Sequence, residues 1–81
     1  MRVIVMKSAK KDYKSLPVEV KNKIKKVIRQ LRKDQLDPEK LTGMKNIWKI
    51  KVGNYRMVME KIEGNLHLQY IELRKDVYKN L

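Results

Sequence analysis

Two short turn sequences divide the second half of the chain, and their spacing constrains the fold more than any other feature. Gly53-Asn54 and Glu63-Gly64-Asn65 are typical of tight turns between neighbouring strands. The runs that they separate, residues 46–52, 55–62 and 66–73, contain many β-branched, aromatic and other apolar side chains. Because strands joined by tight turns pair as hairpins, we expect a mostly antiparallel sheet here.

Polar and apolar side chains alternate in the first of these runs. If it is a strand, Trp48, Ile50 and Val52 share one face, and Lys49 and Lys51 share the other. We expect one face of the sheet to receive helices and the other to stay open. The expected helix-side residues are Trp48, Ile50, Met57 and Leu68, and the expected open-face residues are Lys49, Lys51, Arg56 and Gln69.

The third run shows the same alternation. Leu66, Leu68 and Tyr70 are predicted on the apolar face, which leaves His67, Gln69 and Ile71 on the opposite one.

The first half of the chain predicts one strand and two helices. Residues 2–7 hold a β-branched run suited to a buried strand, and residues 8–15 form a short helix with Ser8 as its cap. A second helix begins after Pro17. Its apolar stripe consists of Val20, Ile24, Val27, Ile28 and Leu31.

The order of elements is therefore β-α-α-β-β-β. We expect an α+β fold in which two N-terminal helices pack on one face of a mostly antiparallel four-stranded sheet. Residues 34–44 contain Asp37-Pro38 and Gly43, so they are expected to form a connection, with room for one helical turn after Pro38. No linker interrupts the 81 residues, which are expected to form a single domain over residues 1–81.

The charge of the chain favours polyanionic partners. Its 21 Lys and Arg against 9 Asp and Glu give a net charge of +12. No apolar run is long enough to span a bilayer, and there is no cysteine for a disulfide or thiolate site. His67 is the only histidine, so a metal site is not expected. A cytoplasmic protein without a cofactor and without membrane contact is the expectation.

Four segments together resemble the RelE/ParE toxin superfamily, and specifically its RelE-like messenger RNA interferase branch. They are Lys40-Leu41-Thr42-Gly43-Met44, Trp48-Lys49-Ile50-Lys51-Val52, Gly53-Asn54-Tyr55-Arg56 and Leu73-Arg74-Lys75-Asp76-Val77-Tyr78. The resemblance implies a toxin of a type II toxin–antitoxin system that cleaves mRNA in the ribosomal A site without a metal. It also implies a cognate RelB-like antitoxin as partner, in an assembly such as a heterotetramer.

The resemblance assigns five candidate catalytic residues, all cationic or phenolic. Lys51 would activate the 2′-OH of the RNA, while Lys49 and Arg56 would hold the phosphate oxygens. Arg74 would contact the phosphate or the leaving oxygen, and Tyr78 would stack on a base or orient the 2′-OH. Relatives often carry Gly-His where this chain has Glu72-Leu73, so a histidine that serves some members as acid or base is missing here.

A second set of cations is predicted to contact mRNA and ribosomal RNA through phosphates. These residues are Lys21, Lys25, Arg29, Arg32, Lys33 and Lys45.

Other interpretations stay open. Lys49 and Lys51 are also compatible with a solvated strand face, and Arg56 with a structural pair to Glu60 or Glu63. Two other functions compete with the nuclease: a ParE-like toxin that inhibits DNA gyrase without cleaving RNA, and a catalytically inactive protein that binds RNA or an antitoxin.

Overall fold

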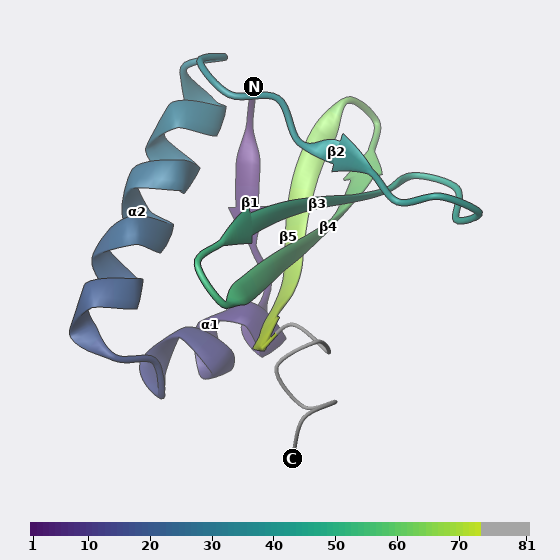
Figure 1. The fold of residues 1–81 in the computed structure, drawn as a ribbon. Helices are drawn as coiled ribbons and strands as arrows, with labels where there is room; N and C mark the ends of the chain where they lie inside the picture. Colours follow the sequence, from purple (N-terminus) through teal and green to yellow (C-terminus); the bar gives the residue numbers. More distant parts are fainter. Residues whose placement is uncertain (74–81) are drawn as a thin grey trace.

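A five-stranded sheet with two helices on one of its faces makes up the structure, a computed structural model that describes residues 1–73 (Figure 1). In chain order the elements are β1 (Val3–Val5), α1 (Lys7–Lys14), α2 (Val18–Arg32), β2 (Glu39–Lys40), β3 (Ile47–Val52), β4 (Tyr55–Ile62) and β5 (Asn65–Leu73). The strand order is β1-β5-β4-β3-β2, and only β1 runs parallel to its neighbour β5.

This arrangement confirms the predicted α+β class and the order of the helices and long strands. The predicted number of strands was wrong by one, because the two-residue β2 adds to the outer edge of β3. Glu39 pairs with Lys49 and Lys40 with Trp48 in antiparallel register. The backbone after Pro38 therefore forms ladder pairs, and the helical turn considered for this connection is not present.

Both predicted turns join hairpins, and their backbone angles explain their residues. Gly53 has φ 60°, the positive value that the first central residue of a type II′ turn requires. In the next turn Glu63 and Gly64 both have positive φ, 51° and 81°, as in a type I′ turn. These turns match the twist of the flanking strands and fix the pairing of β3 with β4 and of β4 with β5.

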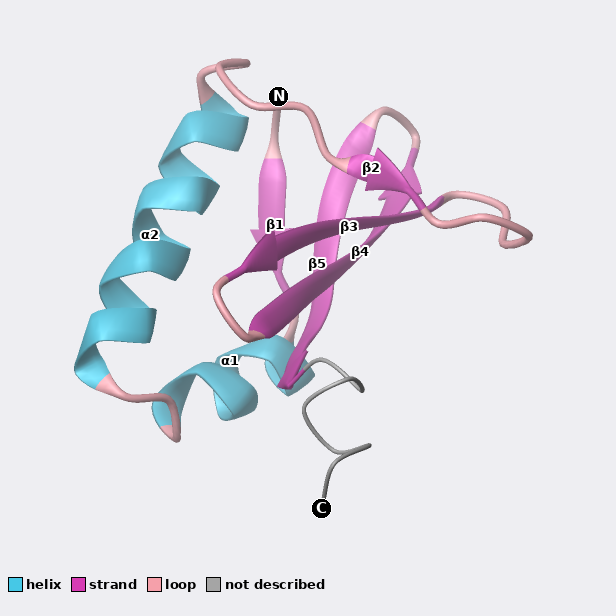
Figure 2. Ribbon diagram, viewed as in Figure 1, coloured by secondary structure: helices cyan, strands magenta, loops and turns pink. Residues whose placement is uncertain are grey.

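The core lies between the helices and the sheet face that they cover (Figure 2). Ala9 of α1 and Ile24 and Leu31 of α2 are buried against Met57 of β4 and Leu68 of β5. The helical stripe predicted from the spacing is thus the packed face of α2. Within residues 1–73, no helix is both long and apolar enough to cross a membrane.

Strand β5 contains a bulge at Gln69. Val58 of β4 pairs with Tyr70, whereas the next residue, Met59, pairs with Leu68, so Gln69 has no partner in the register. The bulge lies where β1 ends, since the last pair of β1 joins Val5 to Leu68.

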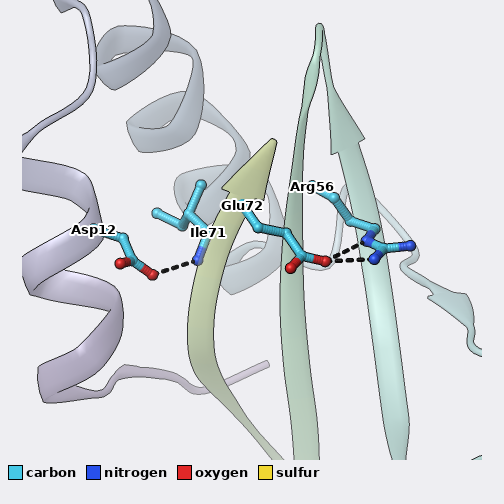
Figure 3. A network of polar contacts seen from close by, with 4 residues as sticks. All are labelled: Asp12, Arg56, Ile71 and Glu72. Atoms are coloured by element: carbon cyan, nitrogen blue, oxygen red, sulfur yellow. Dashed lines mark hydrogen bonds and ion pairs between the residues drawn. The ribbon is translucent and has the colours of Figure 1, made fainter. Parts of the chain in front are cut away.

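Helix α1 replaces β1 beside the bulged part of β5. The Ser8 hydroxyl donates a hydrogen bond to the carbonyl of Gln69. The Asp12 carboxylate accepts one from the backbone N–H of Ile71 at 3.0 Å (Figure 3). Ser8 was expected to cap its helix, but α1 already begins at Lys7 and the Ser8 side chain supports the strand instead.

The bulge reverses the predicted faces at the end of β5. Tyr70 is 41% exposed, while Ile71 is 6% exposed and packs in the core. Strict alternation had placed Tyr70 on the apolar face and Ile71 on the open one, and that prediction was wrong because one unpaired residue shifts every later side chain to the other face.

Alanine substitutions at these two neighbours test the register. Ile71→Ala should lower the free energy of unfolding by about 2–5 kcal/mol, because it opens a cavity in the core. Tyr70→Ala should lower it by less than about 1 kcal/mol, because the ring stands on the open face. Urea denaturation followed by circular dichroism measures both values. Equal losses, or a larger loss at Tyr70, would contradict the bulged register.

Candidate functional site

Three cations predicted as catalytic lie on the open face of the sheet, which the helices do not cover. Lys51 of β3 stands directly opposite Arg56 of β4, and Lys49 lies two residues from Lys51 on the same face of β3. Directly opposed Cβ atoms are roughly 5 Å apart, and residues two apart on one strand are separated by about 7 Å. We call Lys49, Lys51 and Arg56 the open-face cluster.

The cluster belongs to two cross-strand rows. The first row joins Lys51 to Arg56 and Arg56 to Glu72. The second row runs from Glu39 through Lys49 and Val58 to Tyr70, and so spans β2 to β5.

Two carboxylates partly neutralise the cluster. The Arg56 guanidinium donates to one Glu72 oxygen through Nε at 3.1 Å and through a second, shorter contact from Nη2 (Figure 3). The Lys49 ammonium lies 4.0 Å from the Glu39 carboxylate, whose side chain is 70% exposed. Within residues 1–73, no carboxylate lies within 4.0 Å of the Lys51 ammonium.

The structural pair considered for Arg56 therefore exists, but with a different acid. Glu60 and Glu63 were the expected partners, whereas Glu72 is the observed one. Both side chains of the pair keep solvent access, 25% for Arg56 and 34% for Glu72, so an incoming anion can compete for the guanidinium.

Opposed like charges on a sheet disfavour each other unless an anion lies between them. Lys51 and Arg56 are such a pair, and Lys49 adds a third positive charge nearby. A phosphate held at this point would contact all three, with the planar guanidinium able to bind two of its oxygens. The open-face cluster is therefore suited to a phosphodiester.

Arg74 and Tyr78, the other two residues assigned by the resemblance, lie outside the described residues. Leu73, the last residue described, pairs with Tyr55 at the end of β4 that carries Arg56.

The predicted RNA-contacting cations lie apart from the open-face cluster. Four of them are on α2, which packs on the opposite face of the sheet, and Lys33 directly follows that helix. Lys45 is exposed in the connection between β2 and β3. Within residues 1–73, the cations of α2 and the open-face cluster thus form two regions on opposite faces of the sheet.

Two of the α2 cations also make contacts within the protein. Arg32 donates to the carbonyl of Val3 at 3.0 Å, and the Lys21 ammonium lies 5.7 Å from the centre of the Tyr13 ring. Lys25, Arg29 and Arg32 line a hollow of about 240 Å³ beside β1.

A hollow of about 390 Å³ lies between the two helices and the sheet. Its lining is almost entirely apolar, with Tyr13, Ile24 and Leu68 among the residues, and it holds none of the catalytic candidates. The volume of a hollow therefore does not identify the candidate catalytic site, because the catalytic candidates lie on the other face of the sheet.

Sequence reasoning missed two residues of the open face, Glu72 and Tyr70. Glu72 was visible as a departure from relatives, but its pairing with Arg56 depends on the register. No pattern in the sequence indicated that Tyr70 lies exposed on the open face. Gln69, expected beside the cations, donates its side-chain amide to Glu60 at 3.3 Å instead. Among residues 1–73, no group of histidine and acidic side chains is arranged to hold a metal ion.

Comparisons with known proteins agree on one family. Residues 3–76 match the family model described as ParE toxin of type II toxin–antitoxin system, parDE. The chain is 30% identical to Toxin RelE3 of Methanocaldococcus jannaschii, with 96% of each chain covered.

Solved structures show the same fold. The RelB–RelE antitoxin–toxin complex from Methanococcus jannaschii matches with a TM-score of 0.79 and 26% identity, over 96% of this chain and 98% of the other. The isolated E. coli RelE toxin matches with a TM-score of 0.72 and 24% identity, over 98% and 92%.

A double-mutant cycle tests the Arg56–Glu72 pair. Arg56→Ala, Glu72→Ala and the double variant should show a coupling free energy of about 0.2–1 kcal/mol in urea unfolding, since the pair is partly solvent-exposed. The coupling should shrink as salt is added. A coupling of zero at low salt would show that the contact does not stabilise the folded chain.

Proposed function

Since this chain belongs to the ParE toxin family of type II toxin–antitoxin systems within the RelE/ParE superfamily, we propose that it is a ribosome-dependent endoribonuclease that cleaves mRNA in the A site. The toxin assignment follows from the family. The nuclease activity is the proposal, and the observation that carries it is the convergence of Lys49, Lys51 and Arg56 on one open face.

Cleavage through the RNA's own 2′-OH requires removal of the hydroxyl proton, stabilisation of the charged transition state and protonation of the leaving 5′-oxygen. The open-face cluster is suited to the first two. Lys51, in its neutral form, takes the proton of the 2′-OH, whose oxygen then attacks phosphorus. Lys49 and Arg56 hold the non-bridging oxygens, which carry most of the charge in the phosphorane-like transition state. The bond to the 5′-oxygen breaks and leaves a cyclic phosphate. Because the nucleophile belongs to the substrate, this route requires no metal.

The third requirement is a proton for the leaving 5′-oxygen. We assign it to Arg74, with Tyr78 placing a base or the 2′-OH, on the basis of the resemblance alone. Leu73 stands where relatives often carry a histidine, so this chain lacks an imidazole at that point. An incomplete set of acid and base groups agrees with a need for the ribosome to orient the substrate.

The cations on and beside α2 are proposed to contact phosphates of mRNA or ribosomal RNA on the far side of the sheet. Lys25 and Arg29, together with Arg32, surround a common hollow, and Lys33 is exposed directly after the helix. Lys45, exposed in the connection between β2 and β3, is proposed to make a further phosphate contact. Phosphate contacts of this kind position a protein without reading sequence, and they weaken steeply with salt.

The partner that goes with this family is an antitoxin. Relatives were solved as RelB–RelE complexes, among them those of Methanococcus jannaschii and Pyrococcus horikoshii. A RelB-like antitoxin that covers cationic surface on this chain would keep RNA away from the open-face cluster until it is removed.

A gyrase-inhibiting toxin is the second candidate, because the matching family model is described as ParE. Inhibition of this kind needs no catalytic group. Primer extension on translating ribosomes separates the two: cuts in the A site support the nuclease, and their absence together with gyrase-dependent DNA breaks supports the alternative.

Lys51→Ala provides the sharpest test of the mechanism. The variant should lose ribosome-dependent cleavage by at least about 100-fold, the usual contribution of a positioned acid or base. Its thermal melting should stay close to that of the original protein, because the Lys51 side chain is exposed. Primer extension in a purified translation system measures the cleavage.

Lys23→Ala is the matched control. Lys23 is exposed on α2 and belongs to neither cationic set, so the same loss of charge should leave cleavage unchanged. Full activity in Lys51→Ala removes that residue from the mechanism.

Glu72→Gln tests the competition for Arg56. Without the carboxylate charge, the guanidinium is freed for phosphate, and binding of a short single-stranded RNA should tighten about two- to five-fold. Fluorescence anisotropy at fixed salt measures the affinity. Unchanged or weaker binding contradicts the view that Glu72 and RNA share one partner.

A further inference from the structure

We propose that Tyr70 is a stacking platform for a nucleobase of single-stranded RNA bound at the open-face cluster. The inference rests on the proposed function, since it assumes RNA as the ligand. It adds a base-binding group to the described part of the open face, where Lys49, Lys51 and Arg56 act on the phosphate and the 2′-OH.

The position of Tyr70 relative to the cations carries the argument. It occupies the same cross-strand row as Lys49, with Val58 between them. Two strand spacings place the two backbones about 10 Å apart. In the neighbouring row Glu72 lies two residues from Tyr70 on β5, and Arg56, its ion-pair partner, lies diagonally across from Tyr70 on β4. Phosphate-binding and base-binding groups thus lie on one continuous surface.

Core packing among residues 1–73 does not account for the exposure of this ring. Of the aromatic residues described, Tyr13, Trp48 and Tyr55 are half-buried, whereas Tyr70 is 41% exposed. The core positions of β5 are filled by Leu66, Leu68 and Ile71. Val58, its partner across the strands, is only 4% exposed, so one side of the ring lies next to a buried apolar residue.

Exposed aromatic rings beside cations suit single-stranded RNA. Its unpaired bases stack on tyrosine side chains while lysine and arginine contact the backbone. Stacking is worth about 1–3 kcal/mol per base by alanine substitution. Unlike a phosphate contact, stacking releases no counterion, so it does not contribute to the salt dependence of binding.

The test uses a short single-stranded RNA with 2-aminopurine at its centre and 2′-O-methyl groups that prevent cleavage. Base stacking quenches the fluorescence of 2-aminopurine. The variants are Tyr70→Leu, which removes the ring, and Tyr70→Phe, which keeps it. Ile62→Ala is the control, because Ile62 is 40% exposed on the same face but lies four residues from Val58 along β4, about 13 Å away.

The expected result has three parts. Tyr70→Leu should lose the quenching and bind the RNA about five-fold or more weakly. Its slope of log affinity against log salt should stay unchanged, whereas Lys49→Ala should reduce that slope by about 0.7. Tyr70→Phe and Ile62→Ala should behave like the original protein.

Other outcomes overturn the inference. Equal quenching and affinity in Tyr70→Leu would show that no base stacks there, and the nuclease proposal would stand if the original protein still cuts mRNA on ribosomes. Weaker binding of the antitoxin with unchanged RNA binding would assign Tyr70 to the protein partner instead. An original protein that neither binds nor cuts RNA defeats both proposals. Tyr70-dependent quenching without cleavage on ribosomes supports the inference and defeats the nuclease proposal alone.

Discussion

The backbone of β5 is held by α1 at the point where its parallel neighbour ends, and the open face of the sheet depends on this support. Ser8 and Asp12 hydrogen-bond the backbone groups of Gln69 and Ile71 that β1 is too short to reach. Buried or half-buried backbone groups lose free energy of stabilisation when they have no hydrogen-bond partner. The helix supplies these partners and thereby stabilises the bulge. Through the bulge, a contact on the helix side decides which side chains appear on the opposite face of the sheet.

Charge on that opposite face is only partly balanced. Arg56 and Lys49 each have a carboxylate across the strand, while Lys51, which has the most solvent access of the three, has none within ion-pair distance among the described residues. Neutralisation of the flanking cations lowers the repulsion that three adjacent positive charges would otherwise create. It does so through exposed pairs that an anionic ligand can displace, which suits a surface that must remain folded without its substrate.

Much of this architecture follows from local sequence. The apolar stripe of α2 and the glycine-containing turns at Gly53 and Gly64 specify the helix and the hairpins, because periodicity and positive φ are local properties. The co-facial arrangement of Lys49, Lys51 and Arg56 follows from those turns. The predictions that failed concern features formed with distant segments. The bulge at Gln69 is hydrogen-bonded by α1, and β2 forms by pairing with the edge of β3. The exposure of Tyr70 and the partner of Arg56 could be seen only after that register was known.

The separation of the two cationic regions has an electrical consequence. Positive charge lies on both sides of the sheet and the net charge of the chain is +12, so a nucleic acid is attracted to either side. Long-range attraction therefore speeds encounter without selecting an orientation. Alignment on a substrate must arise after contact, from groups that act only over a few ångströms.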